Sequence, residues 1–271
     1  MPPAAAILNR TACDRLAAAY PLSPVVVRHA LAAHPLLSVE ALRTATTRME
    51  SAHVEARAAA TAVGGPFGDL HDDKTADGWT MLRFIDQLPE YHALLASVLA
   101  ELTPVTELKT GAAHDMRGFA FVSAPHAVTP FHFDPEYNLL FQISGNKQFA
   151  VHPAAPPCLP EAAHHALHVG GDNILGWDER FSTQATIFDL TPGEVLFVPY
   201  KCPHWVTVGD EASISLSLTW QSDWTRAQRD AHRLNARLAR WQLPTKPLPA
   251  WPKRPVFRAL AGRALDRLGI A

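Results

Sequence analysis

Cysteine is scarce in this chain, and neither sign of charge dominates it. Three cysteines among 271 residues (Cys13, Cys158 and Cys202) are odd in number and unpatterned, so the sequence predicts no disulfide framework. The net charge is only −2, which does not indicate a general nucleic-acid-binding protein. No apolar run approaches the roughly 20 residues of a membrane span. The first residues lack the basic and apolar segments of a secretory signal, so we expect a cytoplasmic protein with no membrane partner.

The length and the 48% hydrophobic content suit a single domain, residues 1–271, built around one core. Hydrophobic spacing predicts a helical N-terminal part at 1–103, with helices near 27–31, 39–42, 79–88 and 91–99, and a loop at 64–66. Ser38 is a plausible N-cap. A β core is expected at 104–222, interrupted by a long insertion at 153–185, and basic helices at 223–271. The fold class is therefore α+β with a mainly β core.

A His-x-Asp motif supplies the first candidate metal ligands. Side chains two residues apart on a strand point to the same face, so His132 and Asp134 are expected to project together, while Phe131 and Phe133 project into apolar packing. A lone His-x-Asp motif is more often a surface or hydrogen-bonded pair. A third ligand, contributed from elsewhere in the chain, is needed to support a metal site.

His204 is the best candidate for that third ligand. It follows a Pro-Gly turn and a short β-rich run at 195–198, and it opens a second run at 204–208. Two histidines and one carboxylate on one side of a metal suit the iron(II) oxygenases, although catalytic zinc sites also use such a set. Cys202 lies nearby but is interpreted as a small buried residue.

Two further strands carry polar residues with a predicted role. Lys147 follows a hairpin-type turn at 144–146 and starts an apolar strand, so it could point inward and bind an anion; the commoner alternative is a solvated lysine. The run 213–220 alternates strictly between serine or threonine and apolar residues. We expect its polar face to line the interior of a barrel and its apolar face to contact helices.

The two motif segments, 129–147 and 193–204, resemble the JmjC and cupin-type iron(II)/2-oxoglutarate oxygenases. They resemble in particular the asparaginyl hydroxylase that acts on the hypoxia-inducible factor and its bacterial cupin-like relatives. The resemblance extends over about 118–220 and is weak outside that region. Besides the three candidate ligands, it rests on Thr129-Pro130, Asn138, Gln142-Ile143, Gly145, Lys147 and the Gly-acidic-Val-Leu-aromatic-aliphatic-Pro run that starts at Gly193.

The resemblance implies a double-stranded β-helix, or jelly roll, flanked by N- and C-terminal helices. It implies iron(II) held by His132, Asp134 and His204, with 2-oxoglutarate as cosubstrate bound near Thr129, Asn138 and Lys147. The expected reaction uses O2, most simply to hydroxylate a protein side chain, a peptide or a small metabolite. The alternatives are another cupin enzyme, such as an isomerase, and a cupin-fold metal-binding regulator without oxygenase activity.

Two regions outside the motifs carry unusual residues. A predicted short helix at 160–168 places His164 and His168 on one face; no carboxylate partner is obvious, so we expect an exposed helix beside the site rather than a second metal site. From 226 to 271 there are eleven Lys/Arg and two Asp, a balance of +9, which leaves −11 for 1–225. This basic segment is expected to dock on the acidic body, within the chain or across a homodimer, rather than on nucleic acid.

Overall fold

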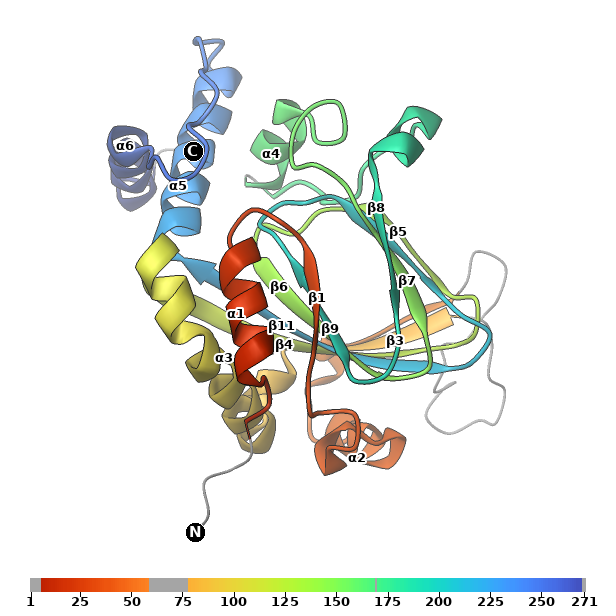
Figure 1. The fold of residues 1–271 in the computed structure, drawn as a ribbon. Helices are drawn as coiled ribbons and strands as arrows, with labels where there is room; N and C mark the ends of the chain where they lie inside the picture. Colours follow the sequence, from red (N-terminus) through yellow and green to blue (C-terminus); the bar gives the residue numbers. More distant parts are fainter. Residues whose placement is uncertain (1–5, 59–77, 169, 270–271) are drawn as a thin grey trace.

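Two antiparallel sheets form the centre of the molecule (Figure 1). The computed structural model describes residues 6–58, 78–168 and 170–269. The larger sheet has the order β1 (Val25–Arg28), β9 (Glu194–Val198), β6 (Tyr137–Ser144), β11 (Ser213–Ser222), β4 (Ala113–Ser123), β3 (Gly78–Arg83) and β2 (Val54–Ala58). The smaller sheet has the order β5 (Val128–His132), β10 (His204–Val208), β7 (Lys147–Val151) and β8 (Thr186–Leu190).

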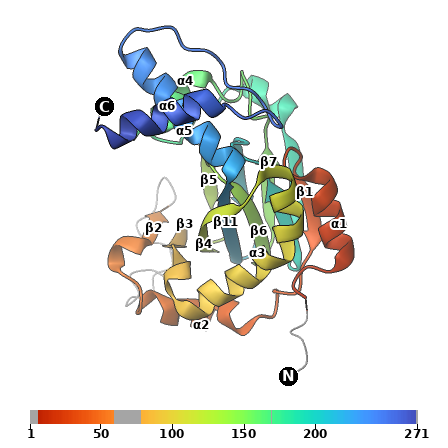
Figure 2. The same ribbon diagram turned by 90° about the vertical axis from the view of Figure 1, so that its left-hand side faces the viewer.

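Helices cover the larger sheet on its outer face and close one end of the structure. They are α1 (Arg10–Ala19), α2 (Val39–Thr46), α3 (Pro89–Thr110), α4 (Glu161–Leu167), α5 (Asp223–Arg240) and α6 (Val256–Arg267), with short 3-10 turns η1 (Pro35–Leu37), η2 (Ser51–His53), η3 (Ile85–Gln87) and η4 (Glu179–Gln184). Figure 2 shows α3 in front of the sheet and beside α1, with α5 and α6 above it. None of the helices among the described residues has both the length and the apolar character needed to cross a bilayer.

Side chains alternate along β6, so the two faces of the larger sheet contribute to two different hydrophobic layers. Leu139 and Phe141 belong to the main core, which lies between the larger sheet and the helices. Leu140, between them in sequence, points the other way and packs with Phe149 and Leu196 between the two sheets. The predicted alternation of polar and apolar faces along β11 is confirmed in the same manner. Its apolar residues join the main core, while Ser217 and Thr219 line the space between the sheets.

The N-terminal part is less helical than the sequence predicts. The helix expected at 79–88 is instead β3 followed by η3, and Val27 lies in β1 rather than in a helix. Residues 79–83 pair with both β2 and β4, so inter-strand hydrogen bonds outweigh the helical spacing of the apolar residues. Conversely, α3 continues through Pro104 to Thr110, into the expected β region.

Other local predictions agree with the structure. Ser38 caps α2, since its side chain accepts a hydrogen bond from the backbone N–H of Ala41. The segment 91–99 is helical, as part of α3. Gly145 has a φ of 63° at the turn before β7, a conformation that glycine adopts without the steric cost of a Cβ. The loop expected at 64–66 lies outside the described residues.

Candidate metal centre

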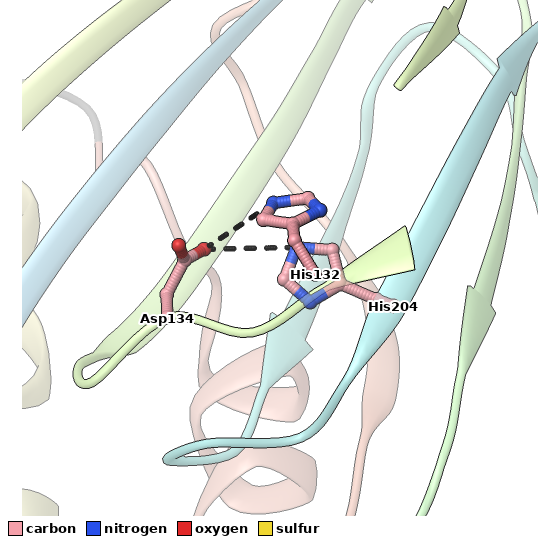
Figure 3. Close-up of side chains that lie close together, drawn as sticks. All are labelled: His132, Asp134 and His204. Atoms are coloured by element: carbon pink, nitrogen blue, oxygen red, sulfur yellow. Dashed lines mark ion pairs between the residues drawn. The ribbon is translucent and has the colours of Figure 1, made fainter. Parts of the chain in front are cut away.

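Three side chains converge where β5 and β10 lie side by side (Figure 3). His132 and His204 are direct cross-strand partners, and their ring centroids are 4.2 Å apart. The Oδ2 of Asp134 lies 3.6 Å from Nε2 of His204 and 3.9 Å from Nε2 of His132. One donor atom from each residue lies within 4.8 Å of the other two. The structure thus brings together the three residues that the sequence singled out.

The local geometry differs in one detail from the expected strand pair. β5 ends at His132, so Asp134 lies in the loop just after the strand rather than on it. The expected alternation nevertheless holds, because Phe131 and Phe133 are both buried. Because Asp134 lies outside the strand, the pleat does not fix the direction of its side chain, and the carboxylate can turn toward His204.

Backbone carbonyls fix the orientation of both imidazoles. Nδ1 of His132 donates to the carbonyl of Pro130 at 2.8 Å, and Nδ1 of His204 donates to the carbonyl of Cys202 at 2.9 Å. Because Nδ1 carries the proton, Nε2 is left with a free lone pair that faces Asp134. Cys202 contributes this carbonyl, while its buried thiol has a pKa raised to about 12 by burial and does not belong to the donor group.

Burial keeps His204 in the form that binds metals. The side chain is 3% exposed, and burial, followed by the nearby His132, lowers the pKa of His204 to about 4. Phe149 stacks on the ring with centroids 4.9 Å apart. A neutral imidazole that is held rigidly against an aromatic ring is a preorganised metal ligand.

The insertion after β7 supplies a partner that the sequence did not reveal. Asn173 donates from Nδ2 to Oδ1 of Asp134 at 3.3 Å, so the other carboxylate oxygen, Oδ2, is the one that faces the histidines. The same segment runs beside β5, where Ile174 bridges to His132 and the carbonyl of Asn173 accepts from the backbone N–H of Phe133. An asparagine in a long insertion has no sequence signal that would mark this role.

A cavity of about 460 Å³ opens beside the three ligands, and its walls come from both sheets. The expected cosubstrate residues Thr129, Asn138 and Lys147 all line it. Thr129 and His132 are three residues apart, which on a regular strand would place them on opposite faces. A bulge between β5 and β10, where His204 pairs with His132 but Val206 pairs with Thr129, brings both onto the cavity side.

Lys147 is buried in this cavity rather than solvated at the turn. It is 6% exposed, its Nζ donates to Oγ of Ser215 at 2.8 Å, and it lies 5.5 Å from the ring centroid of Phe121. Burial lowers the pKa of Lys147 to about 7. Nearby, Oδ1 of Asn138 is buried without a hydrogen-bond partner. A buried amine and an unsatisfied amide are the features of a polar pocket that awaits a ligand.

Glu136 is a further cavity residue that sequence reasoning missed. It lines the cavity two positions after Asp134, and burial, with the neighbouring Asp134 as a smaller cause, raises the pKa of Glu136 to about 7. Its position between the His-x-Asp motif and β6 carries no pattern that distinguishes it from a solvated turn glutamate. It lines the same cavity as Lys147.

The comparisons with known proteins agree with this geometry. No family model matches the chain. Over 114 residues, 38% of the chain, it is 29% identical to the lysine-specific demethylase JMJ31 of Arabidopsis thaliana, and this stretch spans about a fifth (21%) of that protein.

Solved structures of the Escherichia coli ribosomal oxygenase YcfD share the fold. One superposes with a TM-score of 0.54 at 17% identity, covering 95% of this chain and 67% of YcfD. A second, of YcfD in complex with cobalt and 2-oxoglutarate, gives a TM-score of 0.53 at 15% identity, covering 95% and 66%. The expected resemblance to the JmjC-type oxygenases is confirmed. At these identities it is a likeness of fold, and the three ligands rest on this chain's own geometry.

The donor set fits a divalent metal with open coordination positions. His132 and His204 offer free Nε2 atoms, and Asp134 offers an oxygen that no hydrogen bond among the described residues engages. All three residues line the cavity, so further ligands can approach them from it. Two imidazoles and one carboxylate with free positions favour non-haem iron(II).

Proposed function

We propose that this protein is an iron(II)- and 2-oxoglutarate-dependent oxygenase, of the hydroxylase type, whose two sheets form a double-stranded β-helix. The observation that carries this proposal is the single cavity that joins the His132, Asp134 and His204 group to the buried amine of Lys147. A catalytic zinc site would explain the three ligands but not a buried cation in the same cavity. A dicarboxylate cosubstrate explains both.

Each residue has a defined task in this proposal. His132, Asp134 and His204 hold iron(II), and the Nδ1 hydrogen bonds of the two histidines keep their rings aimed at it. Lys147, helped by the Thr129 hydroxyl, binds the distal carboxylate of 2-oxoglutarate, which orients the cosubstrate across the cavity.

Asn138 offers its unpaired amide oxygen to the same pocket, where it positions polar groups of the bound ligands or an ordered water. Phe121 and Phe149 form apolar wall segments that exclude water from the reaction. When bound, iron(II) together with 2-oxoglutarate and O2 supplies the oxidising power needed to attack an unactivated C–H bond.

The prime substrate is proposed to be a protein side chain, a peptide or a small metabolite. YcfD is described as a ribosomal oxygenase and JMJ31 as a lysine-specific demethylase, so polypeptide substrates occur among the proteins that this chain resembles. The acidic wall formed by Glu136 and Asp172 at the cavity favours a substrate with a cationic or amide-bearing group. We propose that the protein works in the cytoplasm.

Turnover of 2-oxoglutarate tests the proposal without knowledge of the prime substrate. Purified protein with iron(II) and O2 is expected to convert 2-oxoglutarate slowly to succinate, as measured by mass spectrometry. Asp134→Ala should abolish both stoichiometric iron binding and this turnover, whereas Asp210→Ala, which removes an exposed carboxylate (side chain 97% exposed), should leave both intact. Unchanged iron content in Asp134→Ala would refute the site assignment.

The C-terminal helices are proposed to mediate self-association through α6. Within the chain, Arg233 and Arg237 on α5 both pair with Asp266 on α6, so this one carboxylate offsets part of the positive charge of α5. Gly262 of α6 lies against the backbone of α5, which brings the two helices close together. The apolar residues Phe257 and Leu260 of α6 remain 90% and 55% exposed, and burying them against a second copy would remove them from water.

A further inference from the structure

A cluster of four histidines lies between α4 and α5, next to Phe133, whose neighbours in sequence are the candidate ligands His132 and Asp134. His164, His165 and His168 come from α4 and His232 from α5, and these two helices pack together (Figure 1). The sequence predicted an exposed α4, and the structure agrees for one face: Glu161, Ala162 and Ala166 are exposed, whereas His164 on the other face is only 6% exposed. The ring of His164 contacts Phe133 with centroids 5.7 Å apart, so the cluster supports the loop that carries Asp134.

Two of these histidines, His165 and His232, and the neighbouring Glu161 place their donor atoms close together. Glu161 and His165 lie four residues apart on α4 and therefore share a helix face. Oε2 of Glu161 is 3.8 Å from Nε2 of His165. One donor atom each from Glu161, His165 and His232 lies within 4.8 Å of the others. The carboxylate that the sequence did not reveal is thus Glu161, and the third ligand comes from a helix more than sixty residues later.

The remaining two histidines hold the ring of His232 rather than compete for the same point. His164 and His168 stack on His232 with interplanar angles of 11° and 27° and centroid distances of 4.9 and 5.4 Å. Imidazole lone pairs lie in the plane of the ring, so those of stacked rings lie in nearly parallel planes and do not converge on one point. His165 is tilted by 53° relative to His232, which allows their lone pairs to converge.

The cluster leaves imidazole nitrogens buried without partners. Nε2 of His165 and Nδ1 of His232 have no hydrogen-bond partner, and the same is true of Nδ1 of His164 and Nε2 of His168. An unsatisfied buried polar atom is costly, so a group that engages several of these nitrogens would stabilise the folded state. Burial is the largest cause that lowers the pKa of all four imidazoles, and this favours their neutral form.

We propose that Glu161, His165 and His232 form a second metal site, which takes zinc(II) with a water as its fourth ligand. Two imidazoles and one carboxylate around a tetrahedral ion form a donor set that zinc accepts. The bound ion would tie α4, in the insertion, to α5, after the last strand, directly behind Phe133. This proposal does not depend on oxygenase activity.

Zinc titration of a protein whose first site is disabled tests the proposal. The background is the full-length variant His132→Ala/Asp134→Ala, stripped of metal, with ZnCl2 as the titrant in isothermal calorimetry. We expect one zinc per chain. Removing an outer partner of a metal ligand costs about 10- to 100-fold in affinity, so Glu161→Gln, which removes a direct ligand, should weaken binding by about 100-fold or more. His165→Gln should have a similar effect.

A matched control distinguishes the loss of a metal ligand from the loss of a negative charge in the first turn of a helix. Glu40 is a first-turn glutamate of α2, just as Glu161 is of α4, so Glu40→Gln removes the same charge at an equivalent helix position. We expect zinc binding to be unchanged in this control. Absence of zinc binding in the background variant would overturn the proposal, as would equal affinity in Glu161→Gln and Glu40→Gln.

Lys201 provides an independent test of the donor set. It is 3% exposed, and its charge contributes to the lowered pKa of all four cluster histidines. Burial lowers the pKa of Lys201 well below its usual range, and whatever positive charge it retains opposes binding of a cation, so Lys201→Met should not weaken zinc binding. Weaker binding in Lys201→Met would mean that the lysine amine is itself a ligand and would overturn the assigned set.

Discussion

Replacing Lys147 with methionine should stabilise the metal-free protein and at the same time weaken the response of the iron-loaded protein to 2-oxoglutarate. Lys147 is 6% exposed and has one hydrogen bond from its amine, to Ser215. Burial lowers the pKa of Lys147 from 10.5 to about 7. Since one pKa unit corresponds to about 1.4 kcal/mol, burying this amine costs about 4 kcal/mol of folding free energy at pH 7. An unpaired Ser215 hydroxyl returns about 1 kcal/mol of this, so the expected net gain is about 3 kcal/mol.

The pH dependence of this gain follows from the direction of the pKa shift. The folded state binds the lysine proton less tightly than the unfolded state does, so the penalty is complete below pH 7 and disappears as the pH rises toward 10.5. Urea unfolding at several pH values between 6.5 and 9.5 should therefore show the stability difference between Lys147→Met and wild type shrinking by about 1.4 kcal/mol per pH unit above pH 7.

The response to added 2-oxoglutarate should then differ in the opposite sense, because wild type should gain more stability from the ligand than Lys147→Met does. Wild type loaded with iron(II) should show a rise in melting temperature with 2-oxoglutarate. The rise should be much smaller in Lys147→Met, because a charge-assisted hydrogen bond of about 1.5–3 kcal/mol is lost. Lys201→Met is the matched control. Burial also lowers the pKa of Lys201, so this variant should likewise be more stable than wild type, but its melting temperature should still rise with 2-oxoglutarate. A Lys147→Met variant that is no more stable than wild type, or that keeps the full response, would refute the reasoning.

Three further predictions concern the site and the surface. Because Lys147 must be charged to pair with a carboxylate, 2-oxoglutarate affinity should be constant below pH 7 and weaken by about tenfold between pH 7 and 8.5, as anaerobic titration of the iron(II) chromophore would show. Asn173→Ala, which frees Oδ1 of Asp134, should weaken iron(II) binding by about tenfold without altering the fold by circular dichroism; unchanged affinity would remove Asn173 from the site. Phe257→Glu with Leu260→Glu should turn a dimer into a monomer in light scattering, and a monomeric wild type would contradict self-association.

The local sequence was sufficient to predict those features that depend on residues close together in the chain. The His-x-Asp motif predicted that His132 and Asp134 lie within reach of each other, and the structure confirms that they converge, although Asp134 lies in the loop just after β5 and not on the strand. The turn at Gly145 and the alternation of β11 were likewise predictable, since both depend only on backbone conformation and on the two-residue period of a strand. His204 was identified by its turn-and-strand context, and strand pairing then placed it opposite His132.

Local pattern failed where pairing over long distances decides the conformation. The apolar run at 79–88 satisfies a helical period as well as a strand, and only its pairing with β2 and β4 makes it β3. The bulge that brings Thr129 to the cavity depends on the register between β5 and β10, which the sequence of β5 does not specify.

The sequence by itself was enough to predict the candidate ligand residues, the strand context of the two histidines and the lysine that accompanies them. Tertiary structure decided which groups are buried together: Asn173 against Asp134, Ser215 against Lys147, and Glu161 with His165 against His232. The physical reason is that hydrogen bonding, pKa and metal affinity depend on distances of a few ångströms and on exclusion of water. Those quantities arise only when segments separated by tens of residues pack against one another.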